Sequence, residues 1–226
     1  MLNWLERMLA VNPSRTAAQL RRPSGWLSHI VGRKMNESNA SMYDFLLRSV
    51  DFTTASTALE IGFGNGKLFD RVLRAAPQIR LRGLDYSTDM VRQARRNMRA
   101  AVRAGHLILE AGSSDRMPYP DGSFDIVYCI NVVYFWDQPA AHLREIRRVL
   151  RPGGRFAAVL RTRSSMQHLP FVQQGFTMYE ASEWQAEVQA HGFARSQVNV
   201  LQEPPVQFAG QSLHPTSLCV VNAVSG

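Results

Sequence analysis

Short apolar segments alternate with amphipathic helical patterns through the middle of the chain. The segments that resemble buried strands are Thr57 to Ile61, Ile79 to Asp85, His106 to Glu110, Phe124 to Ile130 and Gly154 to Arg161. Helical patterns separate them at about 66–76, 87–103 and 139–149. This alternation predicts an α/β fold in which helices cover both faces of a parallel sheet.

The C-terminal part predicts two further strands of a different kind. A helical pattern near 181–191 stops at Gly192, and Ser196 to Leu201 and Thr216 to Val224 then have strand character. Pro204 and Pro205 indicate a loop between these two strands. The complete prediction is a Rossmann-like, seven-stranded, mostly parallel sheet that ends in an antiparallel C-terminal hairpin.

Residues 1–52 predict a helical extension without a strand, which is broken at Arg21-Arg-Pro-Ser-Gly25. Such a segment can form a lid over the carboxyl edge of the sheet, or it can pack against the side of the sheet. The pattern leaves both possibilities open. Because 226 residues suit one α/β domain, we assign this segment to the same domain as residues 53–226.

The net charge of +8 does not alter the predicted fold, but it bears on which partners the protein could bind. Excess positive charge can attract nucleic acid, anionic lipid or an acidic small molecule. Five arginines recur at helical spacing between 92 and 103 and leave an apolar face, as in a solvated outer helix. No basic segment with interleaved aromatics and no RNA-binding signature accompanies them, so we do not expect a nucleic-acid partner.

Localisation and metal binding follow from what the sequence lacks. Glu6 and Arg7 interrupt the apolar residues at the N-terminus, and the longest apolar segment, 124–136, is too short to cross a bilayer. Cys129 and Cys219 lie far apart in apolar segments, without the spacing of a metal site or a disulfide framework. We therefore expect a cytoplasmic protein with no membrane partner and no metal site.

The first strand leads into a glycine-rich turn, Glu60 to Gly66, before the next helix. Glycines at 62, 64 and 66 let the backbone bend sharply and approach a ligand, and the N-terminus of the helix offers free N–H donors. Similar turns also serve packing or bind dinucleotide phosphates. Glu60 would repel a pyrophosphate but attract the ammonium group of a cofactor that carries an amino acid.

The second predicted strand ends at Asp85. A carboxylate in this position can accept hydrogen bonds from both hydroxyls of a ribose, or it can cap the helix that begins near Ser87. If it binds a ribose, Tyr86 and Met90 are placed to form one wall of an adenine site. Each of these two side chains would serve equally well in the core.

Four motifs in this order resemble those of a known family. They are Leu59-Glu-Ile-Gly-Phe-Gly-Asn-Gly66, Gly83-Leu-Asp-Tyr-Ser87 with Met90, Met117-Pro-Tyr-Pro-Asp-Gly-Ser-Phe-Asp125, and Arg148-Val-Leu-Arg-Pro-Gly-Gly154. Together they resemble the class I S-adenosylmethionine-dependent methyltransferases. In particular they resemble the bacterial small-molecule branch that is similar to the ubiquinone and menaquinone biosynthesis methyltransferases.

The resemblance implies S-adenosylmethionine as cofactor, S-adenosylhomocysteine as product, and a set of cofactor-binding residues. The implied set is Glu60, Gly62, Phe63, Gly64, Asn65, Gly66, Asp85, Tyr86, Met90, Ser113, Ser114 and Asn131. Ser113 departs from the family, which usually has an aspartate there for the adenine amino group; its hydroxyl or the backbone at Ser114 could substitute. Asn131 would lie beside the transferring methyl group, or it caps the end of the fourth strand.

The acceptor is less well indicated than the methyl donor. Methyl transfer is an in-line displacement that depends on positioning, and a neutral O, N or S nucleophile also needs a base. His29, Tyr43, Tyr134 and His168 are candidates for the acceptor site, although each also suits a structural role. The catalytic residues are therefore unassigned.

Aromatic residues between 169 and 179 favour a small, planar or apolar acceptor, unless they only pack a crossover. Three alternatives remain: a nucleic-acid or protein methyltransferase that uses the arginine-rich surface, a dinucleotide-dependent oxidoreductase, and a protein that binds the cofactor without catalysis. The atom methylated and the oligomeric state stay open.

Overall fold

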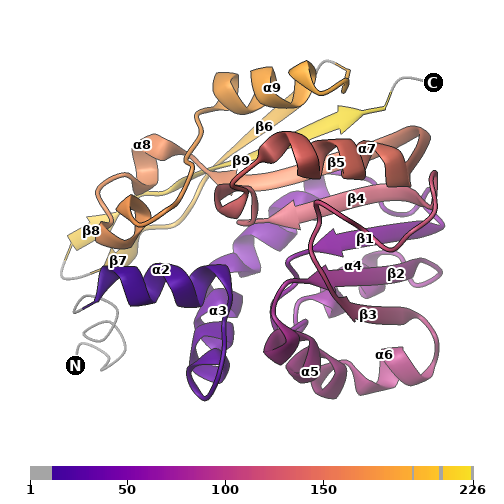
Figure 1. The fold of residues 1–226 in the computed structure, drawn as a ribbon, viewed down its shortest axis with the longest axis horizontal. Helices are drawn as coiled ribbons and strands as arrows, with labels where there is room; N and C mark the ends of the chain where they lie inside the picture. The colour runs from indigo at the N-terminus through magenta and orange to yellow at the C-terminus, as the bar shows by residue number, and fades with distance from the viewer. Residues whose placement is uncertain (1–11, 195, 209–210, 225–226) are drawn as a thin grey trace.

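The computed structural model describes residues 12–194, 196–208 and 211–224. The N-terminal stretch with Glu6 and Arg7, which the localisation prediction used, lies outside them. Within the described residues a twisted sheet is covered by helices on both faces (Figure 1). The elements follow the predicted alternation of strands and helices between residues 57 and 161.

Seven strands form the sheet in the order β3-β2-β1-β4-β5-β9-β6. They are β1 (Thr57–Ile61), β2 (Arg80–Asp85), β3 (Leu107–Ala111), β4 (Phe124–Ile130), β5 (Leu150–Arg161), β6 (Gln197–Gln202) and β9 (Thr216–Ala223). β1 to β5 pair in parallel, whereas β9 pairs antiparallel with both β5 and β6. The predicted fold class, including the antiparallel C-terminal strands, is confirmed.

Two features of the strands differ from the prediction. β5 begins at Leu150 rather than Gly154, because the residues after α7 pair with β4 across a register shift. The segment predicted as a loop near Pro204 and Pro205 carries a second, two-stranded sheet made of β7 (Val206–Phe208) and β8 (Gln211–Leu213). Short antiparallel pairs of this kind give a weak sequence signal because they hold few alternating positions.

The helices of the structure are the predicted ones, with shifted ends, together with a short helix after β5 and two 3₁₀ turns that were not predicted. They are α2 (Pro13–Arg21), α3 (Leu27–Ser49), α4 (Phe69–Ala75), α5 (Thr88–Asn97), α6 (Arg99–Arg103), α7 (Pro139–Val149), α8 (Arg163–Met166) and α9 (Ala181–Ala190), with 3₁₀ turns η1 (Val133–Phe135) and η2 (Pro170–Gln173). The pattern at 87–103, predicted as one helix, is broken at Met98 into α5 and α6. The helix predicted from 66 begins at Phe69, because Gly66 has a φ of 72°.

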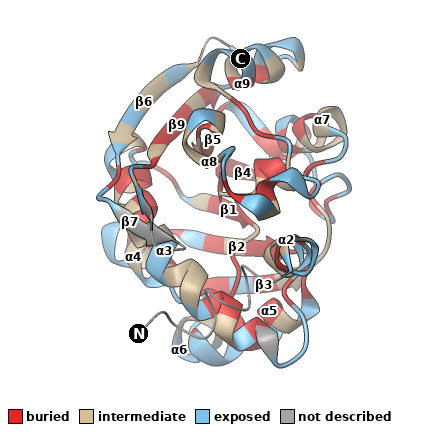
Figure 2. Ribbon diagram, turned by 90° about the vertical axis from the view of Figure 1, so that its left-hand side faces the viewer, coloured by how far each residue is buried: buried red, intermediate tan, exposed pale blue. Residues whose placement is uncertain are grey.

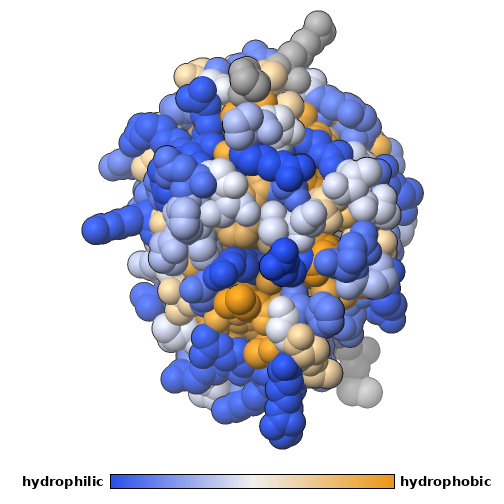
Figure 3. Space-filling model, turned by 90° about the vertical axis from the view of Figure 1, so that its right-hand side faces the viewer, coloured by the Kyte–Doolittle hydropathy of each residue, from blue (hydrophilic) through white to orange (hydrophobic). Residues whose placement is uncertain are grey.

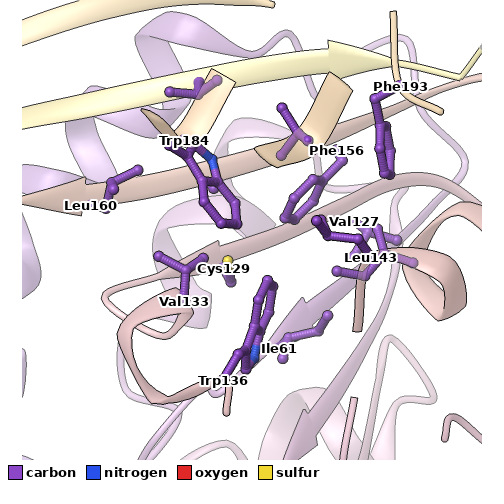
Figure 4. Packing of buried hydrophobic residues seen from close by; sticks show 14 of the residues in the cluster. Ile61, Val127, Cys129, Val133, Trp136, Leu143, Phe156, Leu160, Trp184 and Phe193 are labelled. Carbon is purple, nitrogen blue, oxygen red and sulfur yellow. The ribbon is translucent and has the colours of Figure 1, made fainter. Parts of the chain in front are cut away.

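Two apolar cores lie on opposite faces of the sheet. One packs β strands against α3, α4 and α5 and includes Met42, Leu46, Phe69 and Val91. The other packs the sheet against α7 and α9; Figure 4 shows Trp136 and Trp184 there, with ring centroids 6.0 Å apart. The central strands in Figure 2 are almost entirely buried, as a parallel sheet covered on both faces requires.

The N-terminal segment contacts the rest of the domain in two places. The second half of α3 packs on one face of the sheet, where Met42 and Leu46 are fully buried. α2 and the break at Pro23 lie at the edge where the parallel strands end (Figures 1 and 2). The segment is therefore part of the domain core and also borders the ligand-binding edge of this fold.

The opposite edge of the sheet, at the beginnings of the parallel strands, presents a mostly hydrophilic surface with a smaller apolar patch (Figure 3). Helices long and apolar enough to span a bilayer are absent from the residues described.

Candidate cofactor site

A cavity of about 560 Å³ lies at the carboxyl edge of the parallel strands. Its walls come from the turn after β1, the ends of β2, β3 and β4, the start of α7, and the N-terminal segment. Eight of the twelve predicted cofactor residues line it: Gly62, Gly64, Asp85, Tyr86, Met90, Ser113, Ser114 and Asn131. In an open α/β sheet, ligands bind in a crevice at this edge.

A second, much smaller cavity of about 20 Å³ adjoins the first across the glycine turn. Glu60, Phe63 and Asn65 line this cavity instead, while Gly62 and Gly64 border both. Gly66 borders neither, because it packs against α5: a Cβ there would lie 2.7 Å from the Cβ of Ala94. The structure therefore brings the predicted residues to one locality but divides them between two spaces.

The glycine turn leaves room for a ligand only at Gly64. Gly64 has a φ of 59°, and a Cβ built on it would have no neighbour nearer than the Cε of Met35, at 4.0 Å. A Cβ on Gly62, with a φ of 71°, would lie 2.4 Å from a methyl group of Val132. Gly64 thus opens the floor of the cavity, and Gly62 lets β1 and the loop after β4 approach each other.

Asp85 is held in place by two backbone amides. The N–H of Gly64 donates to Oδ2 and the N–H of Ser87 donates to Oδ1, each at 2.8 Å. Ser87 is the N-cap of α5, since its hydroxyl accepts from the N–H of Met90 at 3.2 Å. The capping role considered for Asp85 therefore belongs to Ser87, and the carboxylate of Asp85 faces the cavity. Burial raises the pKa of Asp85 to about 6.

Glu60 is only 1% exposed and is bound by two tyrosines. The hydroxyl of Tyr43, on α3, donates to Oε1, and the hydroxyl of Tyr128, on β4, donates to Oε2 at 2.8 Å. Burial raises the pKa of Glu60 to about 7, although both tyrosine hydrogen bonds favour the ionised form. Tyr43 thus supports Glu60 beneath the small cavity and does not reach the large one.

The raised pKa of Glu60 predicts a stability that depends on pH. The folded state keeps a proton that the unfolded state releases above its pKa near 4.5, so stability falls as the pH rises towards 7. In Glu60→Gln this contribution is absent, and the loss of unfolding free energy between pH 5 and pH 7 should be about 2 kcal/mol smaller than in the wild type. Guanidinium unfolding of both proteins at the two pH values measures the difference, and equal pH dependence would contradict it.

Asn131 adopts a left-handed backbone conformation, with a φ of 57°, directly after β4. Its Nδ2 donates to Oδ1 of Asn39 at 2.9 Å, and its Oδ1 accepts from the hydroxyl of Tyr134 at 3.0 Å. These bonds tie the loop after β4 to α3 at the wall of the large cavity. Tyr134 itself is 2% exposed and does not line that cavity; its hydroxyl contacts Asn131 and the backbone of Arg161.

The two candidate histidines lie away from both cavities. His29 and His168 are both exposed, and neither lines either cavity.

A different histidine, His142 on α7, lines the large cavity and was not predicted. Its Nδ1 is 2.8 Å from the hydroxyl of Ser114, and its ring stacks on that of Trp136 with centroids 4.7 Å apart. Burial lowers the pKa of His142, which keeps the ring neutral near pH 7.

Several further cavity residues were also missed because they come from the N-terminal segment, from the loop before α7 and from the start of α7. They are Leu20, Arg21, Pro23, Met35, Trp136, Asp137, Gln138 and Ala141. Arg21 and Asp137 form an ion pair between these two regions. The N–H of Gly25 donates to Asp89 at 2.8 Å, which ties the N-terminal break to α5. Nothing in the sequence indicated that these two regions meet.

The adenine residues that the resemblance implies lie together at one end of the large cavity. Met90 is fully buried, whereas Tyr86 is 53% exposed and lies beneath the guanidinium of Arg22, 4.6 Å from the ring centroid. Ser113 and Ser114 follow β3 on the opposite wall. Groups of three or more acidic, cysteine or histidine side chains that could hold a metal ion are absent from the described residues.

Comparison with known proteins decides the family. Residues 59–158 match the family described as "Methyltransferase domain". The uncharacterized methyltransferase YdaC of Bacillus subtilis is 27% identical over 136 residues, which is 60% of this chain and 73% of that protein. The demethylmenaquinone methyltransferase of Deinococcus radiodurans is 34% identical over 97 residues, or 43% of this chain and 39% of that protein.

Residues 59–158 thus form a methyltransferase domain of the class I S-adenosylmethionine-dependent type. S-adenosylmethionine is the cofactor of this family. A putative methyltransferase of Haloferax volcanii, solved in complex with the Trm112 activator, has the same fold: the TM-score is 0.75 at 19% identity, over 89% of this chain and 96% of that one. The match to demethylmenaquinone methyltransferase covers less than half of that relative.

Proposed function

We propose that this protein transfers the methyl group of S-adenosylmethionine to a small, apolar or planar acceptor. The observation that carries the proposal is the placement of the Asp85 carboxylate in one cavity with the open turn at Gly64. Asp85 is a ribose acceptor with a fixed orientation, and the turn leaves the close approach that the methionine part of the cofactor needs. Bound S-adenosylmethionine supplies an activated methyl group for in-line displacement.

The residues present fit the two ends of this cofactor. The buried Glu60 carboxylate lies beneath the turn and offers a partner for an ammonium group. On the other side of Asp85, Met90 and the loop at Ser113 and Ser114 provide an apolar wall and polar edge groups for a base. The assignment of these residues agrees with the roles that the sequence motifs imply.

Aromatic side chains beside the cavity support an apolar acceptor. Phe135 lines the cavity and contacts Phe176, with ring centroids 4.8 Å apart. Phe176 in turn packs against Phe171 of η2, at 5.7 Å, and α2 lies against η2. The region after β5 thus packs against Phe135 in the cavity wall and against α2 of the N-terminal segment, which supports a small apolar acceptor over a polymer.

The experiment that tests this function is incubation of the protein with S-adenosylmethionine and a metabolite extract, followed by mass spectrometry. We expect one compound to gain the mass of one methyl group while S-adenosylhomocysteine accumulates. If methylation appears only when nucleic acid or protein is supplied, and binding to that polymer is sensitive to salt, the small acceptor is refuted in favour of the polymer methyltransferase.

A further inference from the structure

One wall of the large cavity carries side chains whose hydrogen bonds can reverse direction. Ser113 and Ser114 follow β3, and His142 lies on the first turn of α7. A hydroxyl donates or accepts as it rotates, and a neutral imidazole has one donor and one acceptor nitrogen that exchange between its two tautomers. A carboxylate only accepts and a backbone N–H only donates, so neither has this freedom.

His142 is held so that one ring nitrogen is left for a ligand. Its Nδ1 is 2.8 Å from the hydroxyl of Ser114, and its ring is stacked on Trp136 with an angle of 6° between the planes. Nε2 makes no hydrogen bond within the described residues, and the side chain lines the large cavity. The ring is therefore fixed in orientation, while the Ser114 hydroxyl can support either tautomer.

Two carboxylates interact with His142, but neither is buried. Asp115 follows in the same loop and is exposed, and Asp137 is exposed and paired with Arg21. These three are the charged groups that act on the ring, and burial lowers the pKa of His142 and keeps it neutral near pH 7. Solvated charges discriminate weakly between ligands, so the neutral groups of this wall determine which base it accepts.

We infer that Ser113 and the His142–Ser114 pair bind the edge of the cofactor's base in either sense, so that the site accepts the 6-oxo base hypoxanthine as well as adenine. This inference rests on the proposed function and adds a specificity to it. With adenine, Ser113 accepts from the 6-amino group, and Nε2–H donates to N1 while Nδ1 accepts from Ser114. With hypoxanthine every bond reverses: Ser113 donates to O6, Nε2 accepts from N1–H, and Nδ1–H donates to Ser114.

An aspartate in place of Ser113 would select between the two bases. Its carboxylate would accept from the 6-amino group of adenine, but it would face O6 of hypoxanthine with no proton between the two acceptors. Leaving such a pair unsatisfied in a site costs about a factor of ten to a hundred in affinity. The hydroxyl of Ser113 avoids this cost, because it rotates to donate.

Calorimetry with S-adenosylhomocysteine and S-inosylhomocysteine tests the inference. The two ligands differ only at position 6 of the base and in the proton on N1. We expect the wild type to bind both with affinities within about tenfold, and Ser113→Asp to raise the preference for S-adenosylhomocysteine at least about another tenfold. His142→Phe keeps a ring against Trp136 but has no ring nitrogens, so it should weaken both ligands roughly tenfold.

Arg144→Ala is the matched control. Arg144 also lies on α7, is exposed, and lines neither cavity, so this variant should bind both ligands like the wild type. A wild-type preference above about tenfold would overturn the inference, because it would reveal a group of fixed direction at this edge, such as the N–H of Ser114.

The His142→Phe variant tests the histidine separately. A loss confined to one ligand, or absent from both, would contradict the role of His142 at the base. A wild-type protein that binds neither ligand would refute the proposed function itself. Binding of S-adenosylhomocysteine alone would leave the proposed function in place and refute only the permissive base site.

Discussion

Replacing Asp85 with alanine is expected to weaken S-adenosylhomocysteine binding about 100-fold or more. The carboxylate is 6% exposed, lines the large cavity and is fixed by the amides of Gly64 and Ser87. Two hydrogen bonds from ribose hydroxyls to a charged acceptor contribute together about 3 kcal/mol or more, which is about two factors of ten in affinity. Calorimetry at pH 8 measures the loss with Asp85 ionised, because its pKa is about 6.

The control is Asp85→Asn, which keeps the shape and one acceptor oxygen and should lose less affinity than Asp85→Ala. Circular dichroism and thermal unfolding of each variant separate a damaged turn from a damaged site, since Asp85 also holds Gly64. Equal affinity of Asp85→Ala and the wild type would remove the ribose assignment. It would not affect the match of residues 59–158 to the methyltransferase domain.

The central fold was predictable because its signal is local. Strands such as β4 are buried over their whole length, so they appear in the sequence as continuous apolar segments. Helices such as α7 are recognisable from a proline at the first helical position, Pro139, and from an apolar stripe. The break at Met98 and the β7–β8 pair were missed, since both depend on packing or on a few residues rather than on a long periodic pattern.

The site was predictable in so far as its residues directly follow parallel strands. Asp85 and Asn131 end up in one cavity because the carboxyl ends of β2 and β4 meet at one edge. His142 and Arg21 were not foreseen, because their place depends on how α7 and α2 dock, which no local pattern records. Tyr43 was a candidate for the acceptor site, and in the structure its hydroxyl donates to Glu60.

Gly62→Ala is expected to destabilise the folded protein by about 3 kcal/mol or more. The left-handed φ of 71° costs a non-glycine residue about 1–2 kcal/mol. The new Cβ would lie 2.4 Å from Cγ2 of Val132, and relieving such an overlap in a packed region costs about 1–3 kcal/mol more. For a chain of 226 residues this corresponds to a drop in Tm of roughly 10 °C, measured by calorimetric unfolding.

A double variant separates the two causes of this loss. Val132→Ala removes the methyl group that the new Cβ would meet, so Gly62→Ala combined with Val132→Ala should be more stable than the sum of the single losses predicts. The strain of the left-handed backbone remains, so the rescue is partial. Strictly additive losses would show that Val132 does not limit the turn.

Gly64→Ala is the contrasting variant. Its Cβ meets only Met35, at 4.0 Å, so the variant should lose about 1–2 kcal/mol of unfolding free energy from the left-handed backbone alone. Its side chain also enters the cavity, so cofactor binding should weaken.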